Sequence, residues 1–376
     1  MSEERAFWLA WSKVSGVGAV LQKRIQTHFG SLSTAWTVTP EELAEVEGIG
    51  KQSAIAICAH RHQIQVDRLL QDQETQDFLT PADPDYPQLL AEIPDPPPVL
   101  YYRGDLSLIR DLDRQSAVAI VGTRQPSDYG RRWTRKLSKT LAQHGFIVMS
   151  GLADGIDAEA HSSCLEAGGQ TIAVLGTGVD VVYPYKNRRL YDQLLETGLA
   201  LSEYPAGTQP DRAHFPRRNR IVAGLSRAVL VMEAPIKSGA LITATLANEY
   251  GREVYALPGS LDNPRSGGCL ALMSKGAQII LGESELIEAI GAIPALDQTR
   301  EPESTQPPLL DLAPELSQVL QAISTIAQQS NYASAPFDLI VQTAAMSTAT
   351  VSSSLLQLEL IGLVTQVPGM RYQVRS

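Results

Sequence analysis

The stretch Ala117-Val118-Ala119-Ile120-Val121-Gly122-Thr123-Arg124 decides the fold, because an uninterrupted apolar run ends there at a glycine. Such a run is typical of a parallel strand that helices cover on both faces. Helix patterns follow at 129–143 and 157–167. We therefore predict an α/β fold with a doubly wound, Rossmann-like parallel sheet over residues 105–290. Similar apolar runs recur at 146–149, 171–175, 199–202, 228–232, 254–257 and 278–281.

The pattern of residues 1–80, before this sheet, predicts short helices. Two Gly-apolar-Gly triplets, Gly16-Val17-Gly18 and Gly48-Ile49-Gly50, each precede an amphipathic stretch, as in a helix-hairpin-helix or SAM-like domain. Glycines at helix N-termini can free backbone N–H groups for a phosphate. Acidic residues around the second triplet would repel a phosphate, so we favour a helical packing module. They are Glu41, Glu42, Glu45 and Glu47.

Two segments read as linkers. Residues 81–104 are rich in proline, which disfavours helix interiors and central strands, although 99–102 predict a short edge strand. Residues 291–308 are rich in Pro, Glu, Ser, Thr and Gln and predict a flexible linker. Beyond it, residues 309–376 show three helix patterns and a hairpin around Pro368-Gly369, which together predict a winged helix.

Length and composition narrow the class of protein. The 376 residues predict two or three domains, and a hydrophobic content of 44% allows sizeable cores. No apolar run reaches about eighteen residues, so we expect no membrane span. The charged start, Met1 to Arg5, does not resemble a secretory signal. Three separated cysteines without a Cys-x-x-Cys pair fit a reducing, cytoplasmic location; they are Cys58, Cys164 and Cys269.

The net charge of −10 is unevenly distributed along the chain. It is −6 over residues 1–110, zero over 111–290 and −4 over 291–376, so only the predicted sheet domain is not acidic. A local basic patch can steer a polyanion even on an acidic molecule, and solvated surface charge is the alternative interpretation. The basic residues of the sheet domain cluster at 131–139, 186–189 and 212–220.

Five glycine-containing turns follow predicted strands. Because ligands of doubly wound sheets bind at the carboxyl ends of the strands, these turns should meet at one edge. Glycine lets the backbone approach a ligand closely, and helix N-termini offer N–H donors to anions. A phosphate-bearing ligand is therefore expected at this edge. The turns are 122–124, 150–155, 176–180, 238–243 and 258–260.

The run Phe215-Pro216-Arg217-Arg218-Asn219-Arg220 places three guanidinium groups beside one aromatic ring. This combination suits single-stranded nucleic acid, which exposes both bases and phosphates. Alternatively, the arginines pair with carboxylates such as Glu203 and Glu233. We expect Asn219 and Arg220 to be structural, Arg217 and Arg218 to lie nearer solvent, and Phe215 to lie on a loop.

The motifs of common cofactors and enzymes are absent. The chain has neither the Gly-x-Gly-x-x-Gly of dinucleotide enzymes after its first predicted strand nor a P-loop. His161 and Cys164 lie three residues apart, but no further metal ligands cluster with them, so a core or cap role is favoured. A catalytic triad could be imagined from Ser150, Asp157 and His161. The Gly-x-Ser-x-Gly turn that carries the nucleophile of acyl-transfer enzymes is absent, so acyl chemistry is disfavoured. We therefore expect no catalytic residue, no metal and no cofactor.

In combination, these motifs resemble the DNA processing protein A family, called DprA or Smf, over the whole predicted sheet domain. The regions before and after it resemble the family's three-part arrangement less distinctively. The matching strings are 121–124 with Tyr129-Gly130, 150–157 with Ala160-His161, 171–178 with Tyr183-Pro184, 202–205, 215–220, Glu233-Ala234 with 238–244, and Pro258-Gly259.

The resemblance implies a non-enzymatic protein that binds single-stranded DNA and loads the RecA recombinase onto incoming DNA in natural transformation. It also implies a homodimer formed through the late part of the sheet domain, with 270–273 near the dimer or RecA surface. In this family pattern Arg124 and nearby backbone amides hold a nucleotide, Arg212 holds a phosphate, and Phe215 lies against the strand. The implied DNA-binding residues are Gly122, Thr123, Arg124, Ser150, Gly151, Leu152, Ala153, Lys186, Arg212, Phe215, Arg217 and Arg218.

Two other functions are alternatives. Nucleotide N-glycosidases of the related Rossmann type carry a Pro-Gly-Gly-x-Gly-Thr turn followed by a glutamate, whereas this chain has Leu246 in the glutamate's place. A nucleotide sensor would bind mononucleotides without preferring oligomers. The candidate recognition helix of the winged helix, 349–361, holds no Lys or Arg, so we expect a protein-contact or regulatory role there.

Overall fold

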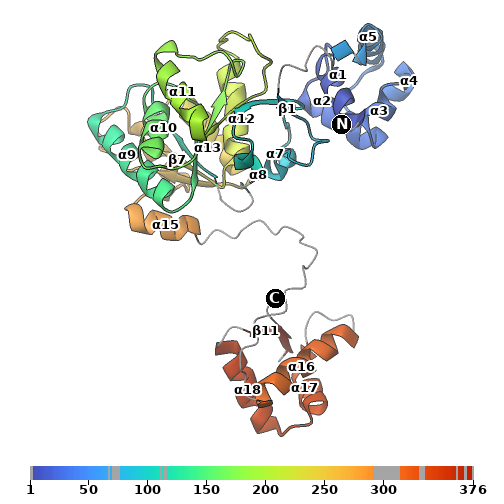
Figure 1. Ribbon diagram of the computed structural model, residues 1–376, viewed down its shortest axis with the longest axis vertical. Coiled ribbons are helices and arrows are strands. Elements are labelled where there is room, and N and C mark those ends of the chain that lie inside the picture. The colour runs from blue at the N-terminus through green and yellow to red at the C-terminus, as the bar shows by residue number, and fades with distance from the viewer. Residues whose placement is uncertain are drawn as a thin grey trace. The chain divides into compact units, whose positions relative to one another are not determined.

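The chain folds into two compact units, Met1–Leu296 and Asp297–Ser376, each with its own apolar core (Figure 1). Of the predicted linker 291–308, only its first residue lies within the described part of the chain. The computed structural model describes residues 3–66, 68–69, 77–110, 112, 117–291, 314–329, 335–360, 363–367 and 371–374.

Short helices at the start of the first unit pack around a core of their own, as predicted for this region. Trp11, Ile25 and Leu43 are fully buried in that core. Gly18 and Gly50, the last glycines of the two triplets, cap the N-termini of the second and fifth helices. The helices are α1 (Glu3–Ser12), α2 (Ala19–Phe29), α3 (Leu32–Ala35), α4 (Pro40–Leu43) and α5 (Lys51–Arg61).

A nine-stranded sheet in the order β1-β2-β6-β5-β4-β3-β7-β8-β9 forms the centre of the first unit. The strands from β3 onward pair in parallel, and β1 and β2 run antiparallel at one edge. The chain winds outward from β3 in both directions, which confirms the predicted doubly wound class. The strands are β1 (Phe78–Leu79), β2 (Leu100–Gly104), β3 (Ala117–Val121), β4 (Ile147–Ser150), β5 (Thr171–Leu175), β6 (Leu199–Ser202), β7 (Ala228–Val231), β8 (Glu253–Ala256) and β9 (Gln278–Ile279).

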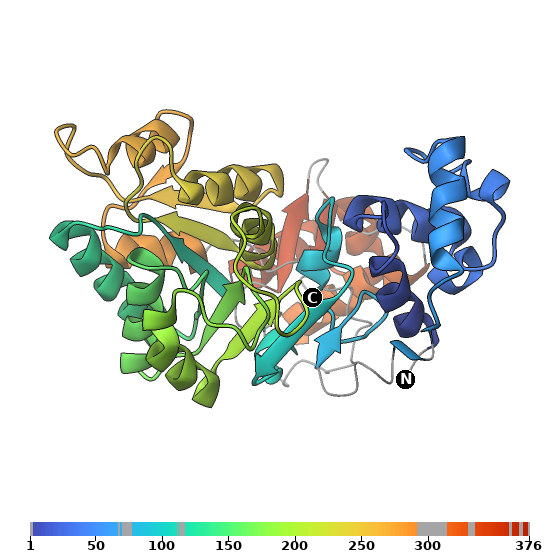
Figure 2. The same ribbon diagram turned by 90° about the horizontal axis from the view of Figure 1, so that it is seen from above.

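Helices cover both faces of this sheet. They are α7 (Gln88–Glu92), α8 (Ser107–Arg110), α9 (Asp128–Gln143), α10 (Ile156–Glu166), α11 (Arg188–Thr197), α12 (His214–Leu225), α13 (Gly239–Glu249), α14 (Gly267–Met273) and α15 (Glu283–Gly291). Ala119 and Met149 pack on the side of α12 and α13, whereas Ile120 and Val148 pack on the side of α9 and α10. Figure 2 shows the green helices and the yellow helices on opposite sides of the strands. Both faces of the inner strands β3 to β7 are buried, which explains their uninterrupted apolar runs.

The proline-rich segment 81–104 is packed into the first unit, unlike the linker that the sequence predicts. Leu90 of α7 is fully buried, and Ile93 is nearly so. A Cβ at Gly224 of α12 would lie 3.0 Å from Ile93 Cγ2 and 3.2 Å from Leu90 Cδ1, so the segment presses closely on that helix. Its strand β2 lies between β1 and β6 and is not the predicted edge strand. The prolines therefore mark turns between packed elements.

The second unit packs three helices against a three-stranded sheet of order β10-β12-β11. The predicted hairpin forms from β11 and β12, and its Pro368-Gly369 turn lies outside the described residues. In the described ranges no single helix is long and apolar enough to cross a membrane. The helices Phe337–Ala344 and Thr348–Glu359 meet the length and hydropathy criteria only when taken together, and the pair is bent by 110°. The elements are α16 (Pro314–Gln329), β10 (Ala335–Pro336), α17 (Phe337–Ala344), α18 (Thr348–Leu360), β11 (Val364–Val367) and β12 (Arg371–Val374).

Truncating the core side chain of the proline-rich segment tests whether it belongs to the folded unit. We expect Leu90→Ala to lower the free energy of unfolding by about 2–5 kcal/mol, because it leaves a cavity under α12. Urea unfolding measures this change. The exposed neighbour substitution Gln88→Ala should stay within about 0.5 kcal/mol of the parent protein. Equal effects of the two substitutions would show that the segment acts as a linker.

Candidate nucleic-acid interface

A groove of about 720 Å³ lies at the carboxyl ends of β3, β4 and β7. The chain turns away from β3 in both directions at this point, which is where doubly wound sheets bind ligands. Three of the five predicted turns, 122–124, 150–155 and 238–243, contribute to its lining, whereas 176–180 and 258–260 do not. The lining residues are Val121, Gly122, Thr123, Arg124, Gln125, Ala153, Asp157, Tyr183, Arg212, Phe215, Pro216, Arg218, Asn219, Pro235, Lys237, Ser238, Gly239, Ala240 and Thr243.

Phe215 lies on this groove in the first turn of α12, and the prediction that it lies on a loop is wrong. Pro216 is tolerated beside it because first-turn N–H groups have no intrahelical partner. A Cβ at Gly176 would come within 2.9 Å of Phe215 Cδ1, so that glycine makes room for the ring. The Tyr183 ring lies 5.5 Å from it at 34°, and Arg124 Cζ lies 5.7 Å from its centroid. These groups form a surface on which a planar ligand can stack.

Three exposed cations line the groove without an ion-pair partner among the described residues: Arg124, Arg212 and Lys237. Arg124 follows β3, Arg212 precedes α12, and Lys237 precedes α13. Because no carboxylate neutralises them, their charge is available to an anion.

Arg218 is buried, and the prediction that it lies nearer solvent is wrong. The residue is 4% exposed, and its Nη1 donates to Gly151 O at 2.7 Å and also to Val174 O. A Cβ at Gly151 would collide with the guanidinium, so this position requires glycine. Burial lowers the pKa of Arg218, an effect that Asp157 opposes and Arg124 reinforces. Arg218 thereby ties α12 to the ends of β4 and β5 beneath the groove.

The turn after β4 directs backbone amides toward a side chain of its own. The N–H groups of Gly151 and Ala153 donate to Asp157 Oδ2 at 3.2 and 3.4 Å. Ser150 and Leu152 are fully buried, and Leu152 adopts a left-handed backbone with φ 55°. Of the residues predicted in this turn, Ala153 lines the main groove, Gly151 lines an adjoining small cavity, and the other two line neither.

Two further residues predicted to bind DNA lie outside the groove lining. Lys186 Nζ lies 3.0 Å from Asp154 Oδ2, and Arg217 Nε lies 3.4 Å from Glu203 Oε2. Both side chains remain more than half exposed, so neither ion pair is strong. Their predicted role in DNA binding gains no support from the geometry.

Sequence reasoning placed the turn 238–243 at this edge, but it named neither Tyr183 nor Lys237 as a binding residue. Tyr183 belongs to a string that carried the family resemblance, but a motif does not show which side chains face a ligand. Lys237 gave no signal, because it lies outside the three basic clusters. Only the approach of the β7–α13 turn to α12 brings it to the groove, where Asn219 Nδ2 donates to Gly239 O at 3.2 Å.

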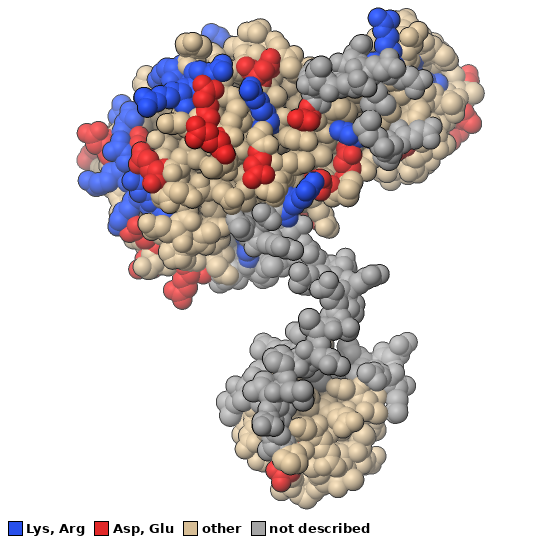
Figure 3. All heavy atoms as spheres, viewed as in Figure 1, with Lys and Arg blue, Asp and Glu red and all other residues tan. Residues whose placement is uncertain are grey.

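The basic cluster 131–139 lies on α9 and is largely neutralised by carboxylates. Figure 3 shows blue and red side chains interspersed over the surface where Figure 1 places α9. This cluster therefore fits the alternative interpretation of solvated surface charge. The pairs are Arg131 and Arg135 with Glu159, Lys136 with Glu283, and Lys139 with Glu166.

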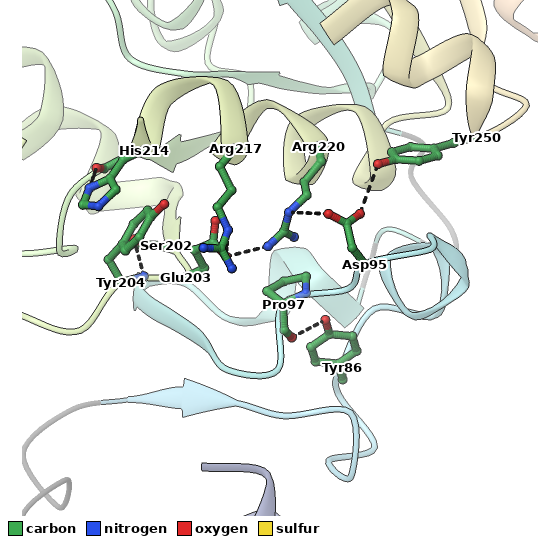
Figure 4. A network of polar contacts seen from close by, with 11 residues as sticks. Tyr86, Asp95, Pro97, Ser202, Glu203, Tyr204, His214, Arg217, Arg220 and Tyr250 are labelled. Atoms are coloured by element: carbon green, nitrogen blue, oxygen red, sulfur yellow. Dashed lines mark hydrogen bonds and ion pairs between the residues drawn. The ribbon is translucent and has the colours of Figure 1, made fainter. Parts of the chain in front are cut away.

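A buried ion network holds the other side of α12 (Figure 4). Glu203, just after β6, accepts a 2.5 Å hydrogen bond from Arg220 Nη2 and pairs with Arg217. Arg220 Nε lies 3.2 Å from Asp95 Oδ2, and Tyr250 OH donates to Asp95 Oδ1 at 3.4 Å. Burial, reinforced by Asp95, raises the pKa of Tyr250 to about 12, so its hydroxyl remains a donor at neutral pH. Arg220 is structural, as predicted, and its pairing with Glu203 matches the alternative interpretation of the arginine run.

Glu233, the other carboxylate considered as an arginine partner, organises loops instead. It is 2% exposed and accepts hydrogen bonds from Ser127 N at 2.7 Å, Ser127 Oγ at 2.8 Å and Asn263 Nδ2 at 2.8 Å. A Cβ at Gly130 would lie 2.6 Å from Glu233 Oε2. The carboxylate therefore joins the loops that follow β3 and β8.

His161 and Cys164 are core residues, as the sequence favoured. His161 is fully buried with its Nδ1 2.7 Å from Thr171 Oγ1, and burial lowers its pKa to about 3. Within the described ranges, no three His, Cys, Asp or Glu residues are grouped to hold a metal ion. Cys58, Cys164 and Cys269 are all buried and free.

Comparisons with known proteins agree on one family. The model for DNA recombination-mediator protein A matches residues 77–291, and the model for the DprA winged helix domain matches 302–370. This chain belongs to the DNA recombination-mediator protein A family, DprA or Smf. Protein Smf of Synechocystis is 49% identical over the full length of both chains. Protein Smf of Escherichia coli is 39% identical over 79% of this chain and 77% of its own.

Solved structures of DprA proteins share the fold. DprA from Streptococcus pneumoniae superposes with a TM-score of 0.67 at 34% identity, covering 77% of this chain and 98% of that one. DprA from Helicobacter pylori, whose structure concerns its single-stranded DNA binding mode, superposes with a TM-score of 0.52 at 34% identity. The superposition covers 57% of this chain and 95% of that one. Together with the match to the winged helix family model, these likenesses confirm the predicted fold class of the chain.

The network of Figure 4 predicts unequal effects for its two sides. We expect Glu203→Gln to lower the free energy of unfolding by about 3–5 kcal/mol, because it removes a carboxylate from the buried guanidinium of Arg220. The comparison variant Arg217→Gln removes the exposed partner of the same carboxylate and should cost about 1 kcal/mol or less. Urea unfolding curves of the two variants measure the difference. Similar losses would contradict the assignment of Arg220 as the principal partner.

Proposed function

We propose that this protein binds single-stranded DNA in the groove at the carboxyl ends of β3, β4 and β7 and acts as a recombination mediator. The observation that carries this proposal is the meeting of Phe215 and Tyr183 with the cations Arg124 and Arg212 in one groove. Aromatic faces stack on bases of any sequence, and cations follow the phosphates between them.

This geometry favours single strands over duplexes. In a duplex the base faces are stacked on one another and cannot reach Phe215, whereas a single strand exposes them. The buried charge of Arg218 lies beneath the same groove and adds to its positive potential. The Helicobacter pylori relative, whose structure concerns single-stranded DNA binding, supports the same assignment.

We further propose that the bound protein loads the RecA recombinase onto incoming DNA in natural transformation, and that it works as a homodimer. Membership of the recombination-mediator family supports this role. A sheet edge with exposed apolar side chains supports dimer formation, because such an edge can meet a second copy. At the β9 edge Ile279 is 50% exposed, and Leu281, just beyond it, is 76% exposed. This edge follows α14, which contains the predicted surface 270–273.

We propose no catalytic step for the groove. Asp157 is the one carboxylate among its described lining residues, and its Oδ2 accepts the amides of Gly151 and Ala153. An N-glycosidase needs a carboxylate facing the sugar, and Leu246 of α13 supplies none. The sensor alternative would require mononucleotides to bind as well as oligomers, which the binding experiment also measures.

Substitutions in the groove test DNA binding directly. We expect Arg124→Ala and Phe215→Ala each to weaken binding of labelled poly-dT by about 1–3 kcal/mol, through loss of a phosphate contact and of base stacking. Fluorescence anisotropy at several salt concentrations, with duplex DNA and mononucleotide as competitors, measures the change. Arg189→Ala removes an exposed cation of α11 outside the groove and serves as the control. Parent-like binding by both groove variants would refute the site.

Filament assembly tests the mediator role. On single-stranded DNA coated with single-strand-binding protein, the chain should accelerate formation of RecA filaments, because a protein bound to the strand can deliver the recombinase to it. Arg124→Ala should reduce this acceleration at the same protein concentration, whereas Arg189→Ala should not. DNA binding without acceleration would refute RecA loading while leaving the groove assignment intact.

A further inference from the structure

A second groove adjoins the first over helix α13. It is a shallow hollow of about 600 Å³, largely open to solvent, and it shares Lys237, Ser238 and Gly239 with the main groove. The two hollows therefore meet at the turn that leads into α13. The residues that line the second groove are Ile236, Lys237, Ser238, Gly239, Leu241, Ile242, Thr245 and Leu246.

The walls of this second groove are apolar and exposed. Ile236 is 71% exposed and Ile242 is 41% exposed. Large aliphatic side chains that are exposed together usually mark a contact site for a ligand or partner. A Cβ at Gly267 of α14 would lie 3.0 Å from Ile236 Cγ1, so Ile236 stands against that helix. No carboxylate lines the groove, and the exposed Lys237 stands where the two grooves meet without an ion pair among the described residues.

A small cavity also adjoins the main groove, beside the turn that follows β4. It has a volume of only about 40 Å³ and shares Arg124, Phe215 and Arg218 with the main groove. This cavity is too small for a nucleotide, so it offers a strand no second binding position. The groove over α13 is large enough for one, and its Lys237 has no ion pair among the described residues.

We propose that the α13 groove is a second nucleotide subsite for the strand that leaves the main groove. One phosphate lies on Lys237, and the next base packs on the aliphatic surface of Ile236 and Ile242. The occupant is DNA of any sequence, because this surface offers contact area without a pattern of hydrogen-bond donors and acceptors. This inference rests on the proposed function and adds to it a direction for the strand and a minimum length for full affinity.

Binding of oligo-dT of different lengths tests the subsite. A labelled oligomer of about 4 nucleotides occupies the main groove, and one of about 16 nucleotides also reaches α13. We expect Lys237→Ala and Ile236→Ser to weaken binding of the long oligomer by about 5- to 100-fold. Ile236 does not line the main groove, so Ile236→Ser should leave the short oligomer within about twofold of the parent protein. Lys237→Ala, at the junction of the two grooves, should weaken the long oligomer more than the short one. For Lys237→Ala, the dependence of log affinity on log salt for the long oligomer should also fall by about 0.7.

Matched substitutions elsewhere separate the possible outcomes. Lys275→Ala and Ile55→Ser, an exposed cation and an isoleucine 60% exposed, should leave binding of both oligomers unchanged. Arg124→Ala should weaken both and thus reports on the main groove alone. An unchanged affinity of the Lys237 and Ile236 variants for the long oligomer overturns the subsite and leaves the α13 groove to a protein partner. Equal losses for the two lengths also overturn it, and a parent protein that binds neither oligomer refutes the proposed function itself.

Discussion

Two buried guanidinium groups on α12 fix the geometry on which the groove depends. Arg218 donates to the carbonyl oxygens of Gly151 and Val174 on the sheet side of the helix, and Arg220 pairs with Glu203 on the other side. A buried charge is stable only where hydrogen-bond or ion-pair partners surround it. Each arginine therefore fixes the position of α12 relative to the partners of its guanidinium group. That position places Phe215, on the first turn of α12, over Gly176 beside Tyr183 and Arg124.

The same constraint explains why glycines and the proline-rich segment lie where they do. Any side chain at Gly151 would collide with Arg218, and one at Gly224 would crowd Leu90 and Ile93 of the segment that carries Asp95 to Arg220. The binding surface is thus supported from beneath by close packing and from behind by ion pairs. A rigid support of this kind keeps aromatic and cationic groups in place before a ligand arrives, which lowers the entropy lost on binding.

Sequence reasoning succeeded where the signal was local. The apolar run 117–121 identified a strand buried on both faces, and strand ends followed by glycine turns located the binding edge. It failed where burial depends on distant partners. Arg218 and Arg217 are neighbours in sequence, yet one is buried and the other exposed, because helical geometry directs them to different surroundings. The prolines of 81–104 suggested a linker, since composition cannot show that Leu90 and Ile93 have a helix to pack on.

The sequence by itself determined the doubly wound sheet, the family and the edge at which a phosphate-bearing ligand is expected, because hydrophobic periodicity and turn glycines are local properties. Only the tertiary structure decided which cations remain free for an anion. Carboxylates on other elements pair with most of the cationic side chains of α9 and with Arg217 and Lys186. Arg124, Arg212 and Lys237 have no ion pair among the described residues. Ion pairing depends on distance in space, and a linear sequence does not contain that distance.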